Sequence, residues 1–285
     1  MLILVNTIVS MKFGFLKRRK FWVRFIFIIF LLPIILFSTL IGILYSNQDY
    51  FVQELIETLN EDFEGHFEIE GSHISPFENF PYISLDFEEL TLFENDTKKG
   101  EHILDIHDVY VGFNIWDILS KNMEIQSIVL KNGSINVVQH EDGSLNIIDA
   151  LTTNKEIEDS NEEFHLNLKS INLTDVDVNK LNKSNGMYFD LYINKAQSNF
   201  KTAGDDVQMF LDSKFIVTYI DNGDTTFIHD KHFDIHTEID YIAEKDILKI
   251  VPSEIALEGA VFNMEGDIDF RNDMDLNINF NGEKQ

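Results

Sequence analysis

The chain has 285 residues, 44% of them hydrophobic, which is enough for one large domain or two smaller ones with a substantial core. All 49 acids follow residue 45, where only 16 bases accompany them, so this part carries a formal net charge of −33. A body this acidic repels phosphate backbones and disfavours nucleic acid as a partner. The absence of cysteine excludes disulfides, thiolate metal sites and cysteine nucleophiles.

The N-terminal part reads as a membrane anchor. Residues 25–45, FIFIIFLLPIILFSTLIGILY, carry no charge and would span roughly 30 Å as a helix. A cleaved signal peptide is the alternative, but the apolar run is long for one and no A-x-A-like site follows. The positive-inside rule places the N-terminus in the cytoplasm and the chain from residue 46 outside it. The bases that set this orientation all lie in a leader, residues 1–24: Lys12, Lys17, Arg18, Arg19, Lys20 and Arg24.

Residues 1–10 precede a second methionine, Met11, which begins a more ordinary basic leader. Translation from Met11 is therefore an alternative that would make residues 1–10 a start-site artefact. At the other end of the chain a cleanly alternating strand pattern stops without a cap or a terminal helix. We expect the chain to be truncated or to be the front portion of a longer protein.

Beyond the anchor the hydrophobic period changes once. Residues 46–65 carry an i, i+3, i+4, i+7, i+8 stripe, which predicts one amphipathic helix ending at Gly65. From His66 onward apolar residues alternate with polar ones, the pattern of β-strands. The expected fold is mainly β: a curved, groove-forming, antiparallel-rich sheet of repeated units. Its divisions are a β region at residues 66–152, an acidic loop at 153–163, and continuing sheet at 164–285.

The alternation slips in a recurring way. In LDFEELTL, Leu85–Leu92, two polar residues stand together between two alternating apolar pairs. The same pattern starts again at Leu104, Met123 and Leu166, at spacings of 19, 19 and 43 residues, which predicts an internal repeat. A β-bulge at each slip would keep all four apolar side chains on one face and would bend the sheet. A hairpin turn is the alternative, but no slip contains Gly or Pro, so the bulge is favoured.

Few residues suggest chemistry. In an extended strand His232, Asp234 and His236 would share one face and could ligate a metal, although a solvated polar face explains the alternation equally well. Phosphate-binding loops, the H-E-x-x-H pair and the G-x-S-x-G elbow are absent from the sequence. We therefore expect no enzyme activity and no cofactor.

Three further stretches follow the leader, the anchor and the amphipathic helix in a fixed order. They are FENFPYISLDFEELTL (Phe77–Leu92), VYVGFNIWDILSKNMEIQSIVLKNGSINVV (Val109–Val138) and EDGSLNIIDAL (Glu141–Leu151). Together they resemble the N-terminal region of AsmA-family proteins, especially those of Bacteroidota. The shared features are a short helix at Trp116–Leu119, a pattern at Ile125–Val137 that contains Asn-Gly, and D-G-x-x-N from Asp142. The resemblance covers residues 12–200 well and 201–285 loosely.

The resemblance implies a single-pass bacterial inner-membrane protein with most of its chain in the periplasm, related to TamB and other bridge-like lipid-transfer proteins. Such proteins are implicated in outer-membrane biogenesis and in phospholipid movement. Expected partners are the inner-membrane bilayer, phospholipid and outer-membrane assembly proteins. Family members are generally much longer, and 285 residues would not bridge an envelope.

The leading functional hypothesis is therefore an apolar β groove that shields or transfers phospholipid. A non-enzymatic scaffold for outer-membrane protein assembly and a cell-surface adhesion module are the alternatives. Ordinary core packing is the alternative explanation for every candidate groove residue. These candidates are Leu85, Phe87, Leu90, Leu92, Leu104, Ile106, Val109, Val111, Ile125, Ile128 and Leu130.

Overall fold

A computed structural model shows two compact units, Met1–Gln48 and Asp49–Gln285. The leader up to residue 18 and the predicted acidic loop at 153–163 lie outside the described residues. The described residues are 19–76, 78–79, 81–95, 102–114, 116–117, 124–152, 168–223, 225–269, 271 and 275–282.

The first unit contains helix α1 (Arg19–Ser46), which includes the predicted anchor. Its segment Trp22–Ile43 is long and apolar enough to cross a bilayer. Polar side chains in this segment bond within the helix, as where the Thr39 hydroxyl donates to the Ile35 carbonyl at 2.8 Å. The helix runs through Pro33, which membrane helices tolerate.

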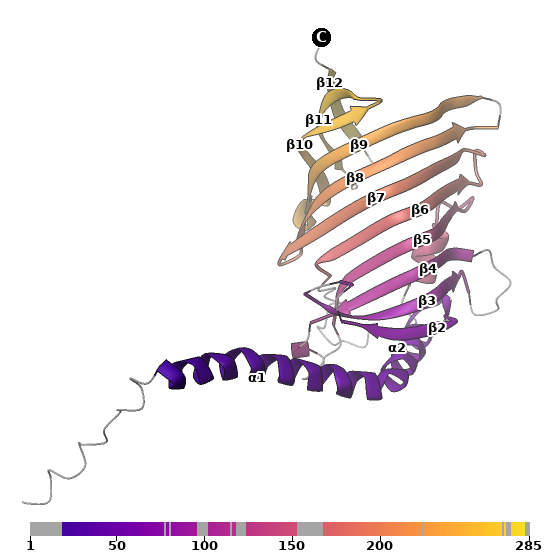
Figure 1. The fold of residues 1–285 in the computed structure, drawn as a ribbon. Helices are drawn as coiled ribbons and strands as arrows, with labels where there is room; N and C mark the ends of the chain where they lie inside the picture. Colours follow the sequence, from indigo (N-terminus) through magenta and orange to yellow (C-terminus); the bar gives the residue numbers. More distant parts are fainter. Residues whose placement is uncertain are drawn as a thin grey trace, which may run out of the picture. The chain divides into compact units, whose positions relative to one another are not determined.

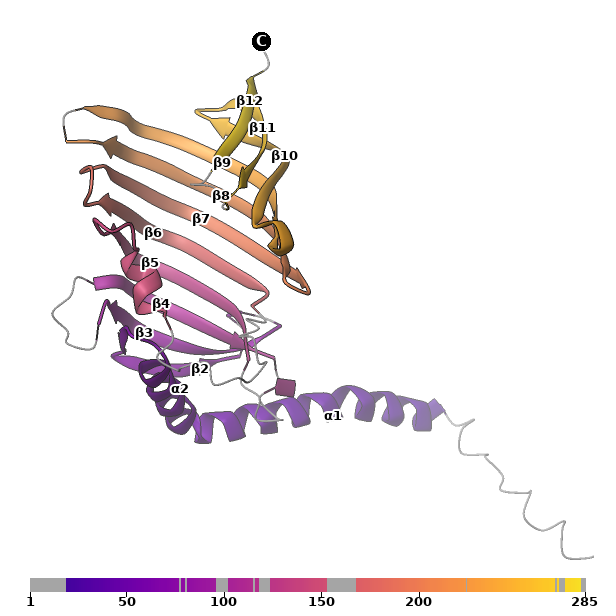
Figure 2. The ribbon, with the colours of Figure 1, turned by 180° about the vertical axis from the view of Figure 1, so that it is seen from behind.

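The second unit is a short helix followed by one large sheet (Figures 1 and 2). Helix α2 (Gln48–Asp62) lies within the predicted range 46–65. The later helical elements are α4 (Asn146–Ala150) and η2 (Ala243–Lys245). The strands are β1 (His66–Glu68), β2 (Gly71–Ser75), β3 (Ile83–Phe93), β4 (His102–Phe113), β5 (Ile125–Gln139), β6 (Ser170–Asn182), β7 (Tyr188–Ala203), β8 (Asp206–Asp221), β9 (Thr226–Ile242), β10 (Ile247–Leu257), β11 (Ala260–Asp269) and β12 (Asp275–Gly282).

The sheet is open, because its strand order runs from β1 through β3 to β12 without closing, while β2 pairs with another part of β3. Neighbouring strands are antiparallel except for β5 and β6. The prediction of a mainly β, antiparallel-rich chain is confirmed. Strands β10–β12 turn away from the direction of β3–β9 (Figure 1). The register of β10 shifts after Ile250 on both sides, next to Pro252, which has no N–H for either neighbour.

The parallel pair β5–β6 places two copies of the predicted repeat side by side. Every paired residue of β6 is 43 positions after its β5 partner, the same spacing found in the sequence. Matching polar side chains then meet, with the hydroxyls of Ser127 and Ser170 2.8 Å apart and the Asn179 amide 3.2 Å from the Asn136 oxygen. The repeat prediction is confirmed for this pair, and its polar ladder helps to hold the parallel strands together.

The prediction of a β-bulge at each slip is confirmed at one copy of the pattern and wrong at two others. At the Met123 copy, Gly112 pairs with Ser127 and Phe113 with Ile125, so Gln126 is an extra residue in β5.

At the Leu85 and Leu104 copies no bulge forms. Glu88 pairs with Asp108 and Leu90 with Ile106, so the register of β3 and β4 is the same before and after Glu89. Glu89 instead adopts a left-handed conformation with φ +52°. On β4, His107 lies opposite Glu89 and is also left out of the pairing, so neither strand contains an extra residue there.

The same irregularity continues across the next strands. Asn132 of β5 and Asp175 of β6 are also left-handed, with φ of +58° and +54°, and both lie at a skipped position in an unbroken register. We call the row Glu89, His107, Asn132 and Asp175 the slip line. Because neighbouring strands slip together, cross-strand pairs stay matched on both sides of the line. The hairpin alternative is also wrong, since these strands run through the slip without a turn.

The core lies where the helices cover the start of the sheet. Both α2 and α4 lie on one side of the sheet (Figure 2). There Leu59, from α2, and Ile147, from α4, pack against a cluster centred on Leu92. The other buried members of that cluster are Phe67, Ile103 and Ala150.

Gly133 directly follows the slip line and touches the backbone of β4. A Cβ added there would meet the Asp105 carbonyl oxygen and would lie 2.7 Å from the Ile106 Cα. Because both are backbone atoms, no side chain can move aside to make room. The Asn-Gly pair in the AsmA-like pattern thus has two structural reasons: a left-handed residue and a close strand contact.

We expect Gly133→Ala to lower the free energy of unfolding by about 1–3 kcal/mol through overpacking. The measurement is chemical denaturation of the full chain in detergent, with circular dichroism as the signal that monitors unfolding. Gly143→Ala is the matched control: Gly143 has φ +92° but open space around its Cβ position, so only backbone strain applies there, about 1 kcal/mol. A Gly133 variant as stable as the wild type would contradict the close contact.

Candidate functional site

The candidate groove residues lie on three neighbouring strands and pair with one another. Leu85 lies opposite Val111 and Phe87 opposite Val109, while Leu90 faces Ile106 across the slip line. Side chains of directly paired residues lie on the same face of a sheet. We call this face the apolar face. Its other candidates continue the rows: Leu92 with Leu104, Ile128 with Val111, Leu130 with Val109, and Ile125 with Phe113.

Burial divides the candidates into two groups. On β3 and β4 the side chains are core, with Phe87 1% exposed and Ile106 fully buried. The other buried candidates are Leu85, Leu90, Leu92, Val109 and Val111. The half-buried candidates are Leu104, Ile125, Ile128 and Leu130. Ordinary core packing therefore accounts for the β3 candidates and for most of those on β4.

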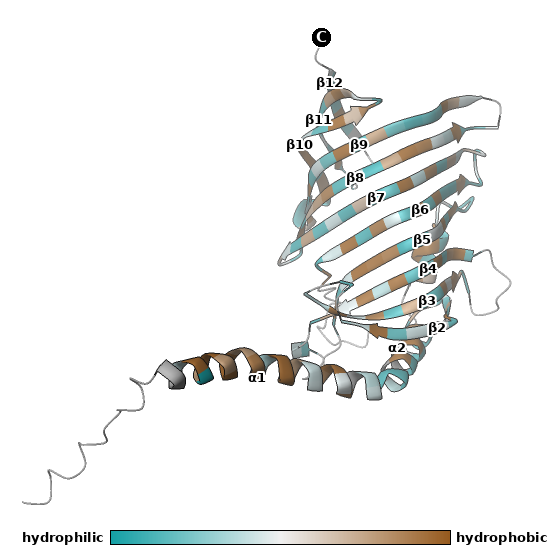
Figure 3. Ribbon diagram, viewed as in Figure 1, coloured by the Kyte–Doolittle hydropathy of each residue, from teal (hydrophilic) through white to brown (hydrophobic). Residues whose placement is uncertain are grey.

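The apolar face extends far beyond the predicted residues. One row runs from Gly133 through Val176, Ile193 and Phe215 to Phe233, linking β5 to β9. Of these, Ile193, Phe215 and Phe233 are half-buried, and the two phenylalanine rings stack with centroids 5.1 Å apart. Hydrophobic positions recur along each of these strands in Figure 3.

The opposite face is polar. Its cross-strand rows contain acids, bases, amides and hydroxyls, with Asn136 beside Asn179 and Asp190 in one row. A second row crosses the sheet from Glu88 through Asp108, Lys131, Thr174, Lys195 and Lys214 to Asp234. The described sheet thus separates an apolar surface from a charged one over most of its width.

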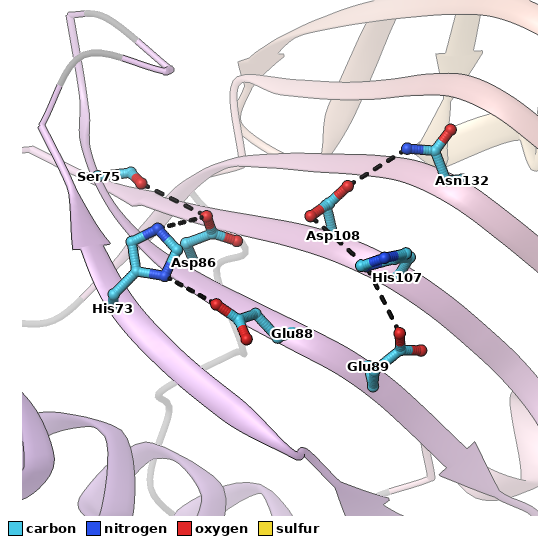
Figure 4. Close-up of polar contacts among 8 residues, drawn as sticks. All are labelled: His73, Ser75, Asp86, Glu88, Glu89, His107, Asp108 and Asn132. Carbon is cyan, nitrogen blue, oxygen red and sulfur yellow. Dashed lines mark hydrogen bonds and ion pairs between the residues drawn. The ribbon is translucent and has the colours of Figure 1, made fainter.

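The densest polar cluster on that face surrounds Asp86, at the β2–β3 edge (Figure 4). The His73 imidazole lies between two carboxylates, with Nε2 3.0 Å from Asp86 Oδ2 and Nδ1 3.3 Å from Glu88 Oε1. Burial raises the pKa of Asp86, and the nearby carboxylates of Asp108 and Glu88 add to this, against the opposing effect of His73. Ser75 Oγ contacts the Asp86 carboxylate rather than the imidazole, so these groups are not arranged as a nucleophile and its base.

A second part of the cluster follows the slip line. The His107 Nδ1 atom is 3.6 Å from Glu89 Oε1 and 3.7 Å from Asp108 Oδ1. The Asn132 amide donates to the other Asp108 oxygen at 3.3 Å. A backbone hydrogen bond, together with Glu89 and Asp108, raises the pKa of His107. These contacts tie side chains at the slip line to neighbouring strands.

The three predicted metal residues do not share one set of contacts. His236 Nε2 contacts Asp234 Oδ1 at 3.2 Å, whereas His232 Nδ1 contacts Glu258 Oε1 at 3.3 Å. Within the described parts of the chain, the group whose ligand atoms all lie within 4.8 Å of one another is a different one: Glu94, His140 and Asp149. The sequence offered little sign of it, because its members come from separate elements.

Comparison with protein-family models and with curated proteins finds no match to this chain. The resemblance to AsmA-family proteins therefore stays a prediction from the order of its motifs. The geometry supplies the independent facts: an open sheet, one polar face, and one apolar face whose side chains beyond β5 are partly half-buried and partly buried, as at Val176.

We expect Asp86→Asn to change the free energy of unfolding more favourably at pH 7 than at pH 4. A raised native pKa means that the folded state binds the Asp86 proton more tightly than the unfolded state does, so the wild type loses stability as pH rises through that pKa. Asparagine has no proton to lose and escapes this penalty. The measurement is urea denaturation across this pH range, with the exposed Asp105→Asn as control. Equal effects at both pH values would contradict the raised pKa.

Proposed function

We propose that this chain is an AsmA-like, membrane-anchored protein that shields or transfers phospholipid on the apolar face of its sheet. The proposal assigns it to the bacterial inner membrane, with the N-terminus in the cytoplasm and the sheet in the periplasm, and to outer-membrane biogenesis. It requires no enzyme activity. The α1 helix is consistent with the anchor by length and composition.

The observation that carries the proposal is the separation of the two faces of the sheet. Apolar rows pass from β3 to β9, while acids and amides occupy the opposite face. Acyl chains leave water at a gain of about 25 cal/mol per Å² of buried apolar surface. An apolar face backed by a charged one can therefore cover acyl chains while its other side stays in water.

Packing along the sheet supports assigning lipid contact to one part of the apolar face. Most β3 and β4 side chains of this face are buried, and those around Leu92 and Ile103 pack under α2 and α4, so they support the sheet rather than line a groove. Half-buried apolar side chains follow on β6–β9, including Leu173, Ile193, Phe215 and Phe233. We assign acyl-chain contact to this part, with the β5 candidates at its boundary.

A scaffold for outer-membrane protein assembly is the second candidate. It is favoured by β12, which is the last strand of the sheet order and pairs with β11. A strand at a sheet edge presents backbone groups that an extended peptide can pair with. This function would use the edge of the sheet, whereas lipid handling would use its face.

We expect a photocrosslinking amino acid at Phe215 to form adducts with phospholipid in cells. The matched control is Tyr219 on the same strand, whose row lies on the polar face beside Asp190. A crosslinker at Phe87, which is 1% exposed, should react only within the protein. Mass spectrometry of the purified adducts identifies the crosslinked species.

Lipid adducts at Phe215 and none at Tyr219 would support the proposal. Protein adducts alone at Phe215 would contradict lipid handling, and adducts to another protein from a crosslinker in β12, at Asn279, would favour the scaffold. Similar lipid adducts at Phe215 and Tyr219 would mean that the two faces do not differ.

A further inference from the structure

Three side chains from separate elements meet beside the α4 end of the sheet. Glu94 follows the end of β3, His140 follows the end of β5, and Asp149 belongs to α4. Their ligand atoms all lie within 4.8 Å of one another. We propose that this group binds one divalent transition-metal ion, best represented by Zn²⁺, and that the ion fastens α4 to the end of β3.

The β5–α4 turn holds His140 in a fixed position. Its backbone N–H donates to the Ser144 carbonyl at 2.9 Å, and its carbonyl accepts from the Gly143 N–H at 3.0 Å. Gly143 makes the turn with φ +92°, a conformation that suits glycine. The Ser144 N–H in turn donates to the Asp142 carboxylate at 3.0 Å. The imidazole therefore projects from a closed, hydrogen-bonded turn.

Helix α4 is held just as firmly, through the buried side chain of Asn146. Its oxygen accepts from the Val138 N–H at 2.9 Å, and its amide donates to the Asn136 carbonyl at 3.0 Å, so α4 is clamped to β5. Asn146 is 1% exposed, and Asp149 follows it within the same short helix. Ligands on rigid supports need little reorganisation to bind an ion.

The charges within the group favour a divalent cation. His140 Nε2 is 2.8 Å from Glu94 Oε1, and both side chains are less than a third exposed. Asp149 brings a second carboxylate into the same space. One imidazole supplies at most one positive charge, so two carboxylates held this close retain an uncompensated repulsion. An ion of charge +2 would neutralise both.

The donor set selects the class of metal. One imidazole nitrogen and two carboxylates suit Zn²⁺, which binds such atoms at about 2.0–2.2 Å and fills remaining positions with water. Two ligand atoms on one tetrahedral ion lie about 3.3–3.6 Å apart, so a pair near the 4.8 Å limit must move together by about 1 Å. Mg²⁺ and Ca²⁺ prefer oxygen ligands and are disfavoured by the imidazole.

The position explains what the ion would do. The backbone of α4 already contacts the segment after α2, since the Gly65 N–H donates to the Ala150 carbonyl at 2.8 Å. Ala150 belongs to the buried cluster with Leu92, next to the proposed ligand Glu94. A metal bridge would lock the cover over this end of the apolar face. This inference does not rest on the lipid proposal.

The test is Zn²⁺ titration of the full chain in detergent, purified with a tag that lacks histidine and freed of metal with a chelator. We expect one Zn²⁺ per chain by calorimetry and a higher thermal unfolding midpoint, since an ion that binds the folded state stabilises it. Asp149→Asn keeps the side chain's shape, and His140→Ala removes the nitrogen ligand. Each should weaken Zn²⁺ binding by at least about tenfold and remove the midpoint shift. Mg²⁺ should give no shift at the same concentration.

His236→Ala is the matched control, because His236 also lies between carboxylates, 3.2 Å from Asp234 and 3.1 Å from Asp212, but with 58% of its side chain exposed. It should leave Zn²⁺ binding unchanged. The proposal is overturned if the wild type shows no saturable Zn²⁺ binding, if Asp149→Asn binds as tightly as the wild type, or if His236→Ala alone abolishes binding. Should His140→Ala fail to fold, the isosteric Asp149→Asn decides the question.

Discussion

The sheet depends on one constraint: where the apolar alternation of one strand shifts by one residue, the neighbouring strand must shift at the same place, or an extra residue must absorb the shift, as at Gln126. A single slip in one strand would send half of its apolar side chains to the wrong face. Here Glu89 slips opposite His107, and Asn132 and Asp175 follow in the next strands, so the pairs on both sides remain apolar with apolar. The left-handed backbone at three of these positions is the local strain that accompanies this alignment.

The shared register gives the sheet two surfaces that differ in chemistry, and packing then divides the apolar one. At β3 and β4 the helices α2 and α4 turn it into a core around Leu92 and Ile103. From β6 onward side chains such as Ile193 and Phe215 stay half-buried. The same alternation therefore serves stability at one end and, in our proposal, lipid contact at the other. On the polar face the same arrangement brings carboxylates close together and partly buries them, which raises the pKa of Asp86.

Much of this could be predicted from local patterns. The apolar stripe predicted α2, period-two alternation predicted the sheet, and the 43-residue spacing predicted a repeat, which the structure shows as the in-register pairing of β5 with β6. The bulge prediction holds at Gln126 in β5 but is wrong at Glu89, because a slip in one strand says nothing about its neighbour, and there the aligned slip at His107 leaves no residue extra. The sequence left open whether Phe87 lies in the core or lines a groove, since alternation gives the face of a side chain but not what covers it. Glu94, His140 and Asp149 meet only through the tertiary fold, so their spacing in the sequence does not predict that they form one group.

The central claim is that the apolar face is core at β3, whereas beyond β5 it carries accessible, half-buried side chains such as Ile193 and Phe215 among buried ones such as Val176. Because the chain has no cysteine, single spin-labelled cysteines can test it along one row, at Leu90, Val176, Ile193 and Phe215. We predict low collision rates with both oxygen and a polar nickel complex at Leu90. At Ile193 and Phe215 we predict high oxygen accessibility, with the nickel complex excluded when phospholipid is added. Uniformly low accessibility along the whole row would contradict the account and identify the face as ordinary core.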